Sequence, residues 1–138
     1  MILLILLGHA EEESWIYKVH KMGGYSTLAF AALNTAIGWR IYNGAPSENL
    51  RNFHRFLGYT TITLSVATST LGYINFWNLR KEEEWRKKRL IHGILSTLST
   101  SAFVASGILA SRGKYKLHRL ASLSATGGTI LTVLWIIW

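Results

Sequence analysis

The stretch FLGYTTITLSVATSTLGYINFWNL, Phe56–Leu79, contains 24 consecutive residues without a charged side chain. Three similar stretches of 18, 22 and 19 residues are Met22–Trp39, Leu90–Ser111 and Leu120–Trp138. A helix needs about 20 apolar residues to cross the hydrocarbon core of a bilayer, so all four stretches are long enough, the first and last narrowly. None of them carries the polar stripe at helical spacing that is typical of a helix on a soluble core. The sequence therefore predicts an all-α, integral membrane protein with four spans.

The composition excludes several kinds of chemistry. The chain has no cysteine, which rules out disulfides, Cys-ligated iron–sulfur clusters and covalently attached c-type haem. All seven acidic residues are glutamates outside the uncharged stretches, so a carboxylate proton relay inside the membrane lacks its residues. The net charge of +8 comes from Lys and Arg at the ends of the stretches, where lipid headgroups explain them. No groove-reading motif accompanies this charge, and we expect no nucleic-acid partner.

The chain divides into a short N-terminal segment and one helical domain. Residues 1–14 are apolar and then acidic, and too short to span a membrane, so lying along the interface and remaining disordered are both left open. Residues 15–138 are expected to form a single up-down four-helix bundle, because the connectors are short enough to make neighbouring helices antiparallel. The expected helices run over residues 15–42, 50–78, 82–111 and 114–138.

One histidine lies near the beginning of each expected helix, and these residues are His20, His54, His92 and His118. In an up-down bundle the first and third helices begin on one side of the membrane, and the second and fourth begin on the other. His20 can then face His92, and His54 can face His118, near opposite surfaces. Two facing imidazoles are the ligand set of a six-coordinate haem iron. The alternative is that each histidine makes a structural hydrogen bond to a neighbouring helix; His9 lies outside the pattern and receives no role.

Small and basic residues accompany the histidines. A Gly or Ser follows each histidine by four positions, one turn further along the same face, where it would leave room for a flat macrocycle. Close packing of helices without any cofactor explains small residues equally well. Basic residues flank the histidines and could pair with haem propionates, although contact with lipid headgroups explains most of them. The candidate cofactor-binding residues are Gly24, Gly58, Ser96, Ser122, Arg51, Arg55, Arg89, Lys116 and Arg119.

With these features, residues 15–138 resemble the four-helix core of the trans-membrane di-haem cytochromes of the cytochrome b-561 family. The resemblance rests on the order of the histidines, the small residues behind them and the basic flanks. It implies two b-type haems, with His20 and His92 as axial ligands of one and His54 and His118 of the other. It also implies a minimal or prokaryotic-type form, because the flanking helices of eukaryotic members are absent. The basic residues of the family's ascorbate site have no clear counterparts in this sequence.

The sequence leads to two hypotheses about function. The first is trans-membrane electron transfer through two bis-histidine haems, one near each membrane face, in a plasma or inner membrane. The second is a haem-bearing membrane-anchor subunit of a quinone-linked dehydrogenase or reductase. An electron carrier is favoured over an enzyme with its own substrate chemistry, and a ferric, quinone or ascorbate-type reductase is left open. The expected partners are the lipid bilayer and a small-molecule or protein donor and acceptor, such as an ascorbate-like reductant or a quinone; a homodimer is also left open.

Overall fold

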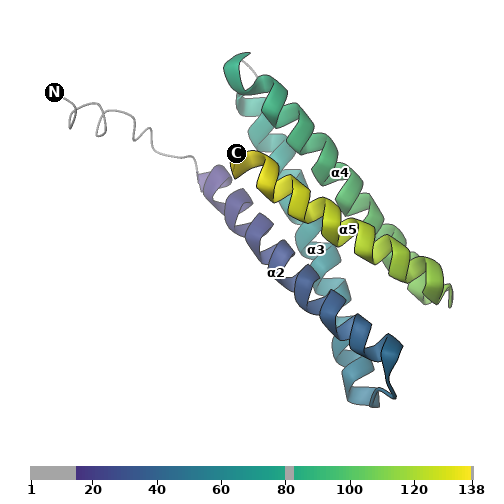
Figure 1. Ribbon diagram of the computed structural model, residues 1–138. Coiled ribbons are helices and arrows are strands. Elements are labelled where there is room, and N and C mark those ends of the chain that lie inside the picture. Colours follow the sequence, from purple (N-terminus) through teal and green to yellow (C-terminus); the bar gives the residue numbers. More distant parts are fainter. Residues whose placement is uncertain (1–14, 80–82, 138) are drawn as a thin grey trace.

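The structure is a computed structural model that describes residues 15–79 and 83–137. The expected N-terminal segment, residues 1–14, lies outside them. The described residues form four long helices joined by short connectors, as Figure 1 shows. These helices are α2 (Trp15–Asn43), α3 (Glu48–Leu79), α4 (Glu83–Ser111) and α5 (Tyr115–Ile137). The predictions of an all-α chain and of a four-helix bundle are confirmed, and the helix bounds differ from the expected ones by a few residues.

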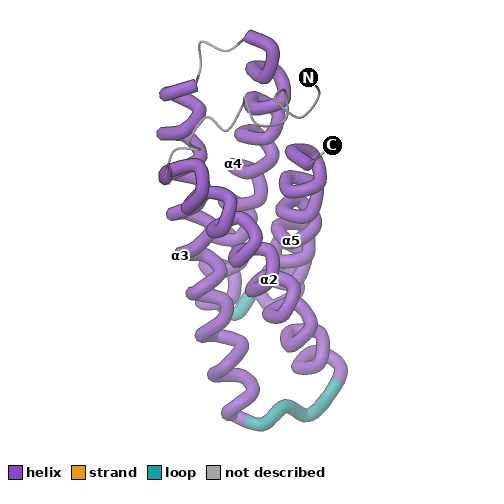
Figure 2. Tube along the Cα trace, turned by 90° about the vertical axis from the view of Figure 1, so that its left-hand side faces the viewer, coloured by secondary structure: helices purple, strands orange, loops and turns teal. Residues whose placement is uncertain are grey.

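The bundle is built from two hairpins that pack against each other. The most extensive contacts lie within the hairpins, between α2 and α3 and between α4 and α5, and further contacts join α3 to α4 and α2 to α5. The described parts of α2 and α4 lie diagonally opposite each other, and so do those of α3 and α5, as the view in Figure 2 helps to show. Side chains from diagonal helices can therefore meet only across the interior of the bundle.

Capping interactions fix where the helices begin and end at the two connectors that lie at one end of the bundle, between α2 and α3 and between α4 and α5. Ser47 lies just before α3, and its side-chain oxygen accepts a hydrogen bond from the Leu50 backbone N–H at 3.3 Å, as an N-cap residue does. At the other connector, Gly113 has a φ of +68°, which a glycine adopts without strain. The Gly113 N–H bonds the Ala110 carbonyl and the Lys114 N–H bonds the Leu109 carbonyl, at 3.1 and 2.9 Å. This pattern is a Schellman motif, and it ends α4 where α5 must turn back.

The bundle has small and hydroxyl-bearing residues inside and large apolar residues outside. The buried polar side chains among the described residues are Thr27, Thr61, Ser65, Ser99, Ser106, Thr126, Thr129 and Thr132. Many large apolar side chains, Leu98 and Phe56 among them, are exposed along the helices. By length and apolar composition alone, one described helix qualifies as a membrane span, over Arg86–Ser111 of α4.

Gly128 permits the close approach of α5 to α4. A Cβ atom at this position would contact the side-chain oxygen of Ser99 and lie 3.4 Å from its Cβ. We expect Gly128→Leu to destabilise the bundle by about 1–3 kcal/mol, because the larger side chain forces the two helices apart. The loss is measured by unfolding in detergent followed by circular dichroism. The neighbouring Gly127→Leu is the control, since a Cβ there meets no atom within 4 Å; equal stability of the two variants would contradict the prediction.

Candidate functional site

The four histidines meet in two pairs across the interior of the bundle. The ring centroids of His20 on α2 and His92 on α4 are 5.9 Å apart, and their planes cross at 83°. The centroids of His54 on α3 and His118 on α5 are 6.1 Å apart, with planes crossing at 74°. A metal–imidazole bond is about 2 Å long and the centroid lies about 1 Å behind the nitrogen, so two imidazoles on one metal ion have centroids roughly 6 Å apart. Both pairs have this spacing, and each draws its rings from diagonal helices.

Hydrogen bonds to backbone carbonyls orient three of the four rings. The Nδ1 atom of His20 donates to the Thr68 carbonyl oxygen at 2.9 Å, and that of His92 donates to the Thr132 carbonyl at 3.1 Å. The Nδ1 atom of His118 lies 2.9 Å from the Ser106 carbonyl oxygen. A carbonyl can only accept, so in each of these rings the hydrogen is on Nδ1 and Nε2 carries a lone pair.

The residues whose backbone carbonyls face the histidine rings are placed in the same way in both hairpins, and we call this the reciprocal arrangement. Residues 34, 68, 106 and 132 each lie fourteen positions after the histidine of their own helix, which is about four helical turns. Each of them faces the histidine of the hairpin partner: α2 and α3 exchange contacts, and so do α4 and α5. The two hairpins therefore repeat one arrangement, in which each helix supplies one histidine and one acceptor for its neighbour's histidine.

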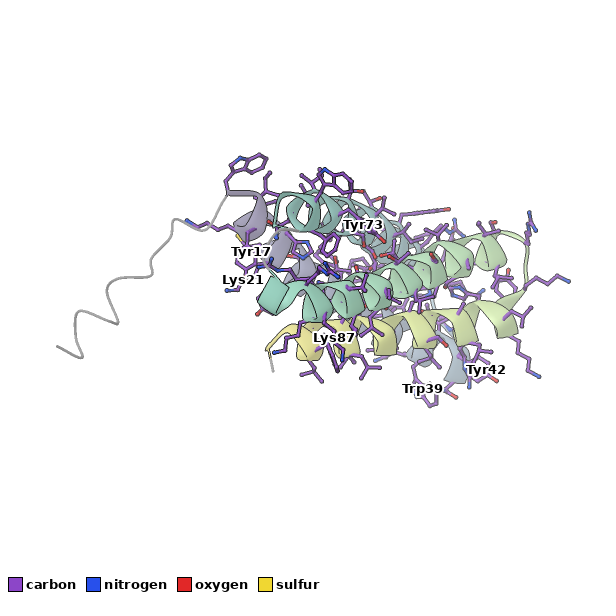
Figure 3. The ribbon with its side chains drawn as sticks, turned by 90° about the horizontal axis from the view of Figure 1, so that it is seen from above. Tyr17, Lys21, Trp39, Tyr42, Tyr73 and Lys87 are labelled. Carbon is purple, nitrogen blue, oxygen red and sulfur yellow. The ribbon has the colours of Figure 1, made fainter. Side chains whose placement is uncertain are left out.

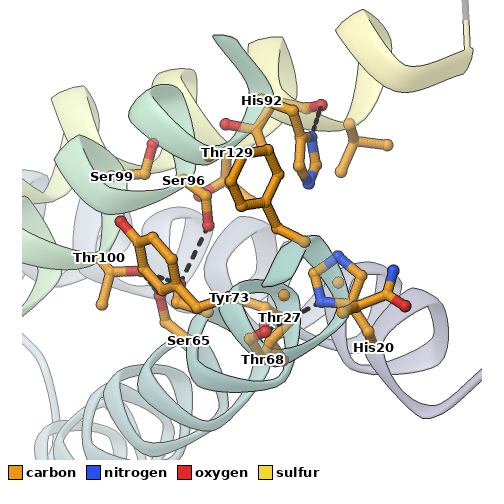
Figure 4. A pocket seen from close by; sticks show the side chains of 18 of the residues that line it. His20, Thr27, Ser65, Thr68, Tyr73, His92, Ser96, Ser99, Thr100 and Thr129 are labelled. Atoms are coloured by element: carbon orange, nitrogen blue, oxygen red, sulfur yellow. Dashed lines mark hydrogen bonds between the residues drawn. The ribbon is translucent and has the colours of Figure 1, made fainter. Parts of the chain in front are cut away.

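Nε2 is the ring nitrogen left for a metal ion. In Figure 4 the rings of His20 and His92 point toward each other from opposite sides of a cavity, and each turns its bonded nitrogen toward the carbonyl. None of the four Nε2 atoms has a hydrogen bond to a described residue. Histidines that bind metals almost always donate their other ring N–H to a carbonyl, carboxylate or water. The first pair thus has both the spacing and the outer hydrogen bonds of a metal-binding pair.

A cavity of 390 Å³ surrounds the first pair. This volume lies in the range of about 300–1,000 Å³ that is usual for sites of small molecules and cofactors. Besides the two histidines, its lining includes the predicted residues Gly24, Ser96 and Arg89. Hydroxyl-bearing residues make up much of the wall.

Most of these hydroxyls already have partners. Thr27 donates to the Gly23 carbonyl at 2.8 Å, Ser99 to Leu95 at 2.9 Å, and Thr132 to Gly128 at 2.8 Å, each within its own helix. A second group of hydroxyls bond one another between α3 and α4, at distances from 2.7 to 3.0 Å; they belong to Ser65, Ser69, Ser96 and Thr100. A group entering the cavity would therefore meet few unpaired polar atoms, although the lining is rich in oxygen.

Two glycines lie directly against the histidine rings of their hairpin partners. A Cβ atom at Gly72 would lie 2.8 Å from Cε1 of His20, and a Cβ at Gly38 would lie 2.9 Å from Cε1 of His54. Cβ atoms do not approach other atoms this closely, so each ring occupies the space that a side chain would fill. Gly38 and Gly72 each lie one turn after residues 34 and 68, the carbonyls that face the same rings.

The other predicted cofactor-binding residues do not line the cavity around the first pair. A Cβ atom added at Gly58 would lie 3.4 Å from the side-chain nitrogen of Asn34. Ser122 is half-buried on α5. The Arg119 guanidinium is packed on the Tyr42 ring at 4.1 Å and lies 5.6 Å from the Trp39 ring. The remaining basic candidates are exposed, and these are Arg51, Arg55 and Lys116. Their role as partners of propionates stays a prediction.

Aromatic and basic side chains also meet at the opposite end of the bundle. The Lys21 ammonium lies 5.8 Å from the centre of the Tyr17 ring. Figure 3 shows Tyr17 and Lys21 near one end and Trp39 with Tyr42 near the other. Interleaved aromatic and basic residues of this kind are typical of the two membrane–water interfaces.

Sequence reasoning did not identify the residues that orient the histidines. The acceptors at Thr68, Ser106 and Thr132 act through backbone oxygens, which no residue type reveals. One regularity in the sequence does mark the face of each helix that points into the bundle. The residue seven positions after each histidine is small, and the structure buries it. These residues are Thr27, Thr61, Ser99 and Ala125.

The structure thus brings the rings together in the predicted pairs, while their role as metal ligands stays a prediction. Comparison with known proteins adds no family: no family model, no curated protein and no solved structure matches this chain.

Proposed function

We propose that this chain is an integral membrane electron-transfer protein that holds two b-type haems, one between His20 and His92 and one between His54 and His118. The observation that carries the proposal is the geometry of the two pairs, with centroids 5.9 and 6.1 Å apart. Carbonyl acceptors behind the rings support it, because they leave Nε2 for the metal. A purely structural role for the histidines would explain the carbonyl bonds but not the facing of two Nε2 atoms in one cavity.

The donor set favours haem over a bare metal ion. Each pair supplies two neutral imidazoles, and no group of three or more His, Cys, Asp or Glu gathers among the described residues. A zinc ion prefers four ligands, three of them from the protein even in catalytic sites. A haem brings four nitrogens of its own and needs two more axial ligands. The cavity around the first pair gives a flat macrocycle space beside the ligands.

The distribution of side chains supports a place in the membrane. Hydroxyls and small residues fill the interior, whereas Phe56, Leu98 and many other large apolar residues cover the outside. Small residues let transmembrane helices approach closely, and interhelical hydroxyl bonds hold them there. Basic residues packed on aromatic rings lie at both ends of the bundle. The proposed orientation therefore places one histidine pair, with its single haem, near each face of the bilayer.

The chemistry assigned to the chain is one-electron transfer. With two histidines holding each iron, the haems would supply one-electron transfer rather than oxygen binding. The four histidines would hold the iron through Nε2, and the carbonyl partners of His20, His92 and His118 fix the tautomer. The rings are half-buried between the helices, and this burial together with the hydrogen bonds would set the reduction potential.

Haem stoichiometry tests the proposal directly. Protein produced with ample haem and purified in detergent should contain two haems per chain and show the visible spectrum of six-coordinate, low-spin b-type haem. Reconstituted in sealed vesicles, it should reduce an enclosed acceptor from an impermeant external donor. Colourless protein would refute the haem sites. A two-haem protein that passes no electron across sealed vesicles would refute trans-membrane transfer and leave haem binding intact.

A further inference from the structure

One of the four histidines departs from the reciprocal arrangement. Nδ1 of His54 is buried and has no hydrogen bond to a described residue, although the Asn34 backbone carbonyl faces its ring. Oδ1 of the Asn34 side chain is also buried without a partner. Among the described residues, these are the two buried side-chain nitrogen or oxygen atoms that lack one. One is a hydrogen-bond donor in the tautomer that a metal requires, and the other can only accept.

The equivalent position of the other hairpin shows that a side chain can reach such a ring. Ser106 occupies on α4 the place that Asn34 occupies on α2, fourteen residues after the histidine of its helix. The Ser106 hydroxyl oxygen lies 2.8 Å from Nδ1 of His118, in addition to the carbonyl at 2.9 Å. His118 is the residue that His54 faces. Both members of the second pair therefore have a polar side chain from the hairpin partner at this position.

The space for the Asn34 amide comes from Gly58. The Asn34 side-chain nitrogen lies 3.4 Å from the position of a Cβ at Gly58, which is one turn after His54 on α3. The amide thus lies against the part of α3 that carries His54. The gap at Gly58, which the sequence suggested for a macrocycle, holds this amide.

We propose that Asn34 is a positioning residue for His54: its side-chain oxygen accepts the Nδ1 hydrogen of His54 and keeps the tautomer in which Nε2 is free for iron. The proposal rests on the proposed function, because it names the outer hydrogen bond of the second pair. Pairing the two atoms satisfies a buried donor and a buried acceptor at once. A hydrogen bond from Nδ1 makes the imidazole a stronger electron donor, so it lowers the reduction potential of bound iron.

Substitutions at Asn34 in a His92→Ala background, which retains the second pair alone, test this role. Asn34→Leu removes the acceptor, and the reduction potential of the remaining haem should rise while its low-spin spectrum persists. Asn34→Asp supplies a stronger acceptor, and the potential should fall below that of the parent. Asn52→Leu, at an exposed position on α3, is the control and should leave the potential unchanged. Potentials at Asn34→Leu and Asn34→Asp equal to that of the parent would overturn the proposal.

A second measurement separates this proposal from the proposed function. Nitrogen-15 NMR of the imidazoles in haem-free protein should show His54 with its hydrogen on Nδ1 in wild type, and a mixture of tautomers in Asn34→Leu. Unchanged tautomers would overturn the role of Asn34 whether or not haem binds. If Asn34→Leu does not fold, the direction of the shift in Asn34→Asp decides the question. Absence of haem from the wild-type protein would refute the proposed function alone.

Discussion

Replacement of His92 by Ala should remove one haem per chain and leave the other in place. The variant keeps His54 and His118, whose rings are 6.1 Å apart and come from the other two helices. The first pair retains only His20, so one of the two iron–nitrogen bonds that would anchor the haem to the chain is lost, and we expect this site to release its haem. Total haem per chain, measured against protein concentration, should fall by half, and the remaining haem should keep its low-spin spectrum.

The remaining histidine variants make the test specific. His118→Ala should also halve the haem content, with loss of the second site, and the double variant His92→Ala/His118→Ala should bind none. Leu98→Ala, at an exposed position on α4, is the control and should retain both haems. Full haem content in His92→Ala, or its complete loss, would contradict the assignment of the pairs.

A methyl group at Gly72 should abolish the first haem site without changing any ligand. The Cβ of Gly72→Ala would lie 2.8 Å from Cε1 of His20 and 3.2 Å from its Nδ1. The ring cannot swing away while Nδ1 remains bonded to the Thr68 carbonyl, one turn earlier on the same helix. The methyl group therefore either displaces the ring from His92 or breaks the bond that fixes its tautomer. We expect haem content to fall toward one per chain, with at least a tenfold lower affinity at the first site.

Two further glycine variants complete this experiment. Gly38→Ala should affect the second site instead, since its Cβ would lie 2.9 Å from Cε1 of His54. Gly127→Ala on α5 is the matched control, because a Cβ there meets no atom within 4 Å and the residue does not line the cavity around the first pair. It should retain both haems and gain about 0.5–1 kcal/mol of helix stability. Equal haem content in Gly72→Ala and Gly127→Ala would show that close contact at Gly72 does not govern binding.

The sequence was sufficient to predict the helices and the pairing of the histidines. Uncharged stretches gave the helix positions, and short connectors made the order of the histidines determine which rings could meet. Both inferences depend on spacing along one chain. The turn that ends α4 depends on the positive φ of Gly113, and the sequence predicted its place but not its hydrogen bonds.

The surroundings of the rings were less predictable, because they depend on how far each helix slides along its neighbour. The carbonyl that orients His20 belongs to Thr68, and a shift of α3 by one residue would present a different oxygen. The position of α3 along α2 also determines that Gly58 faces the side-chain amide of Asn34 rather than open space. Thr68, Ser106 and Thr132 orient the rings through their backbone oxygens, so their residue types carried no signal.

The origin of each histidine pair also has a consequence for how the molecule assembles. His20 and His54 belong to the α2–α3 hairpin, and both of their facing partners belong to the α4–α5 hairpin. Neither half of the chain can complete a site alone. On the proposed function, each iron atom is a cross-link between the halves, and loading with haem should raise the resistance of the chain to separation in denaturing detergent. Insertion of the cofactor and closure of the tertiary structure then become a single event.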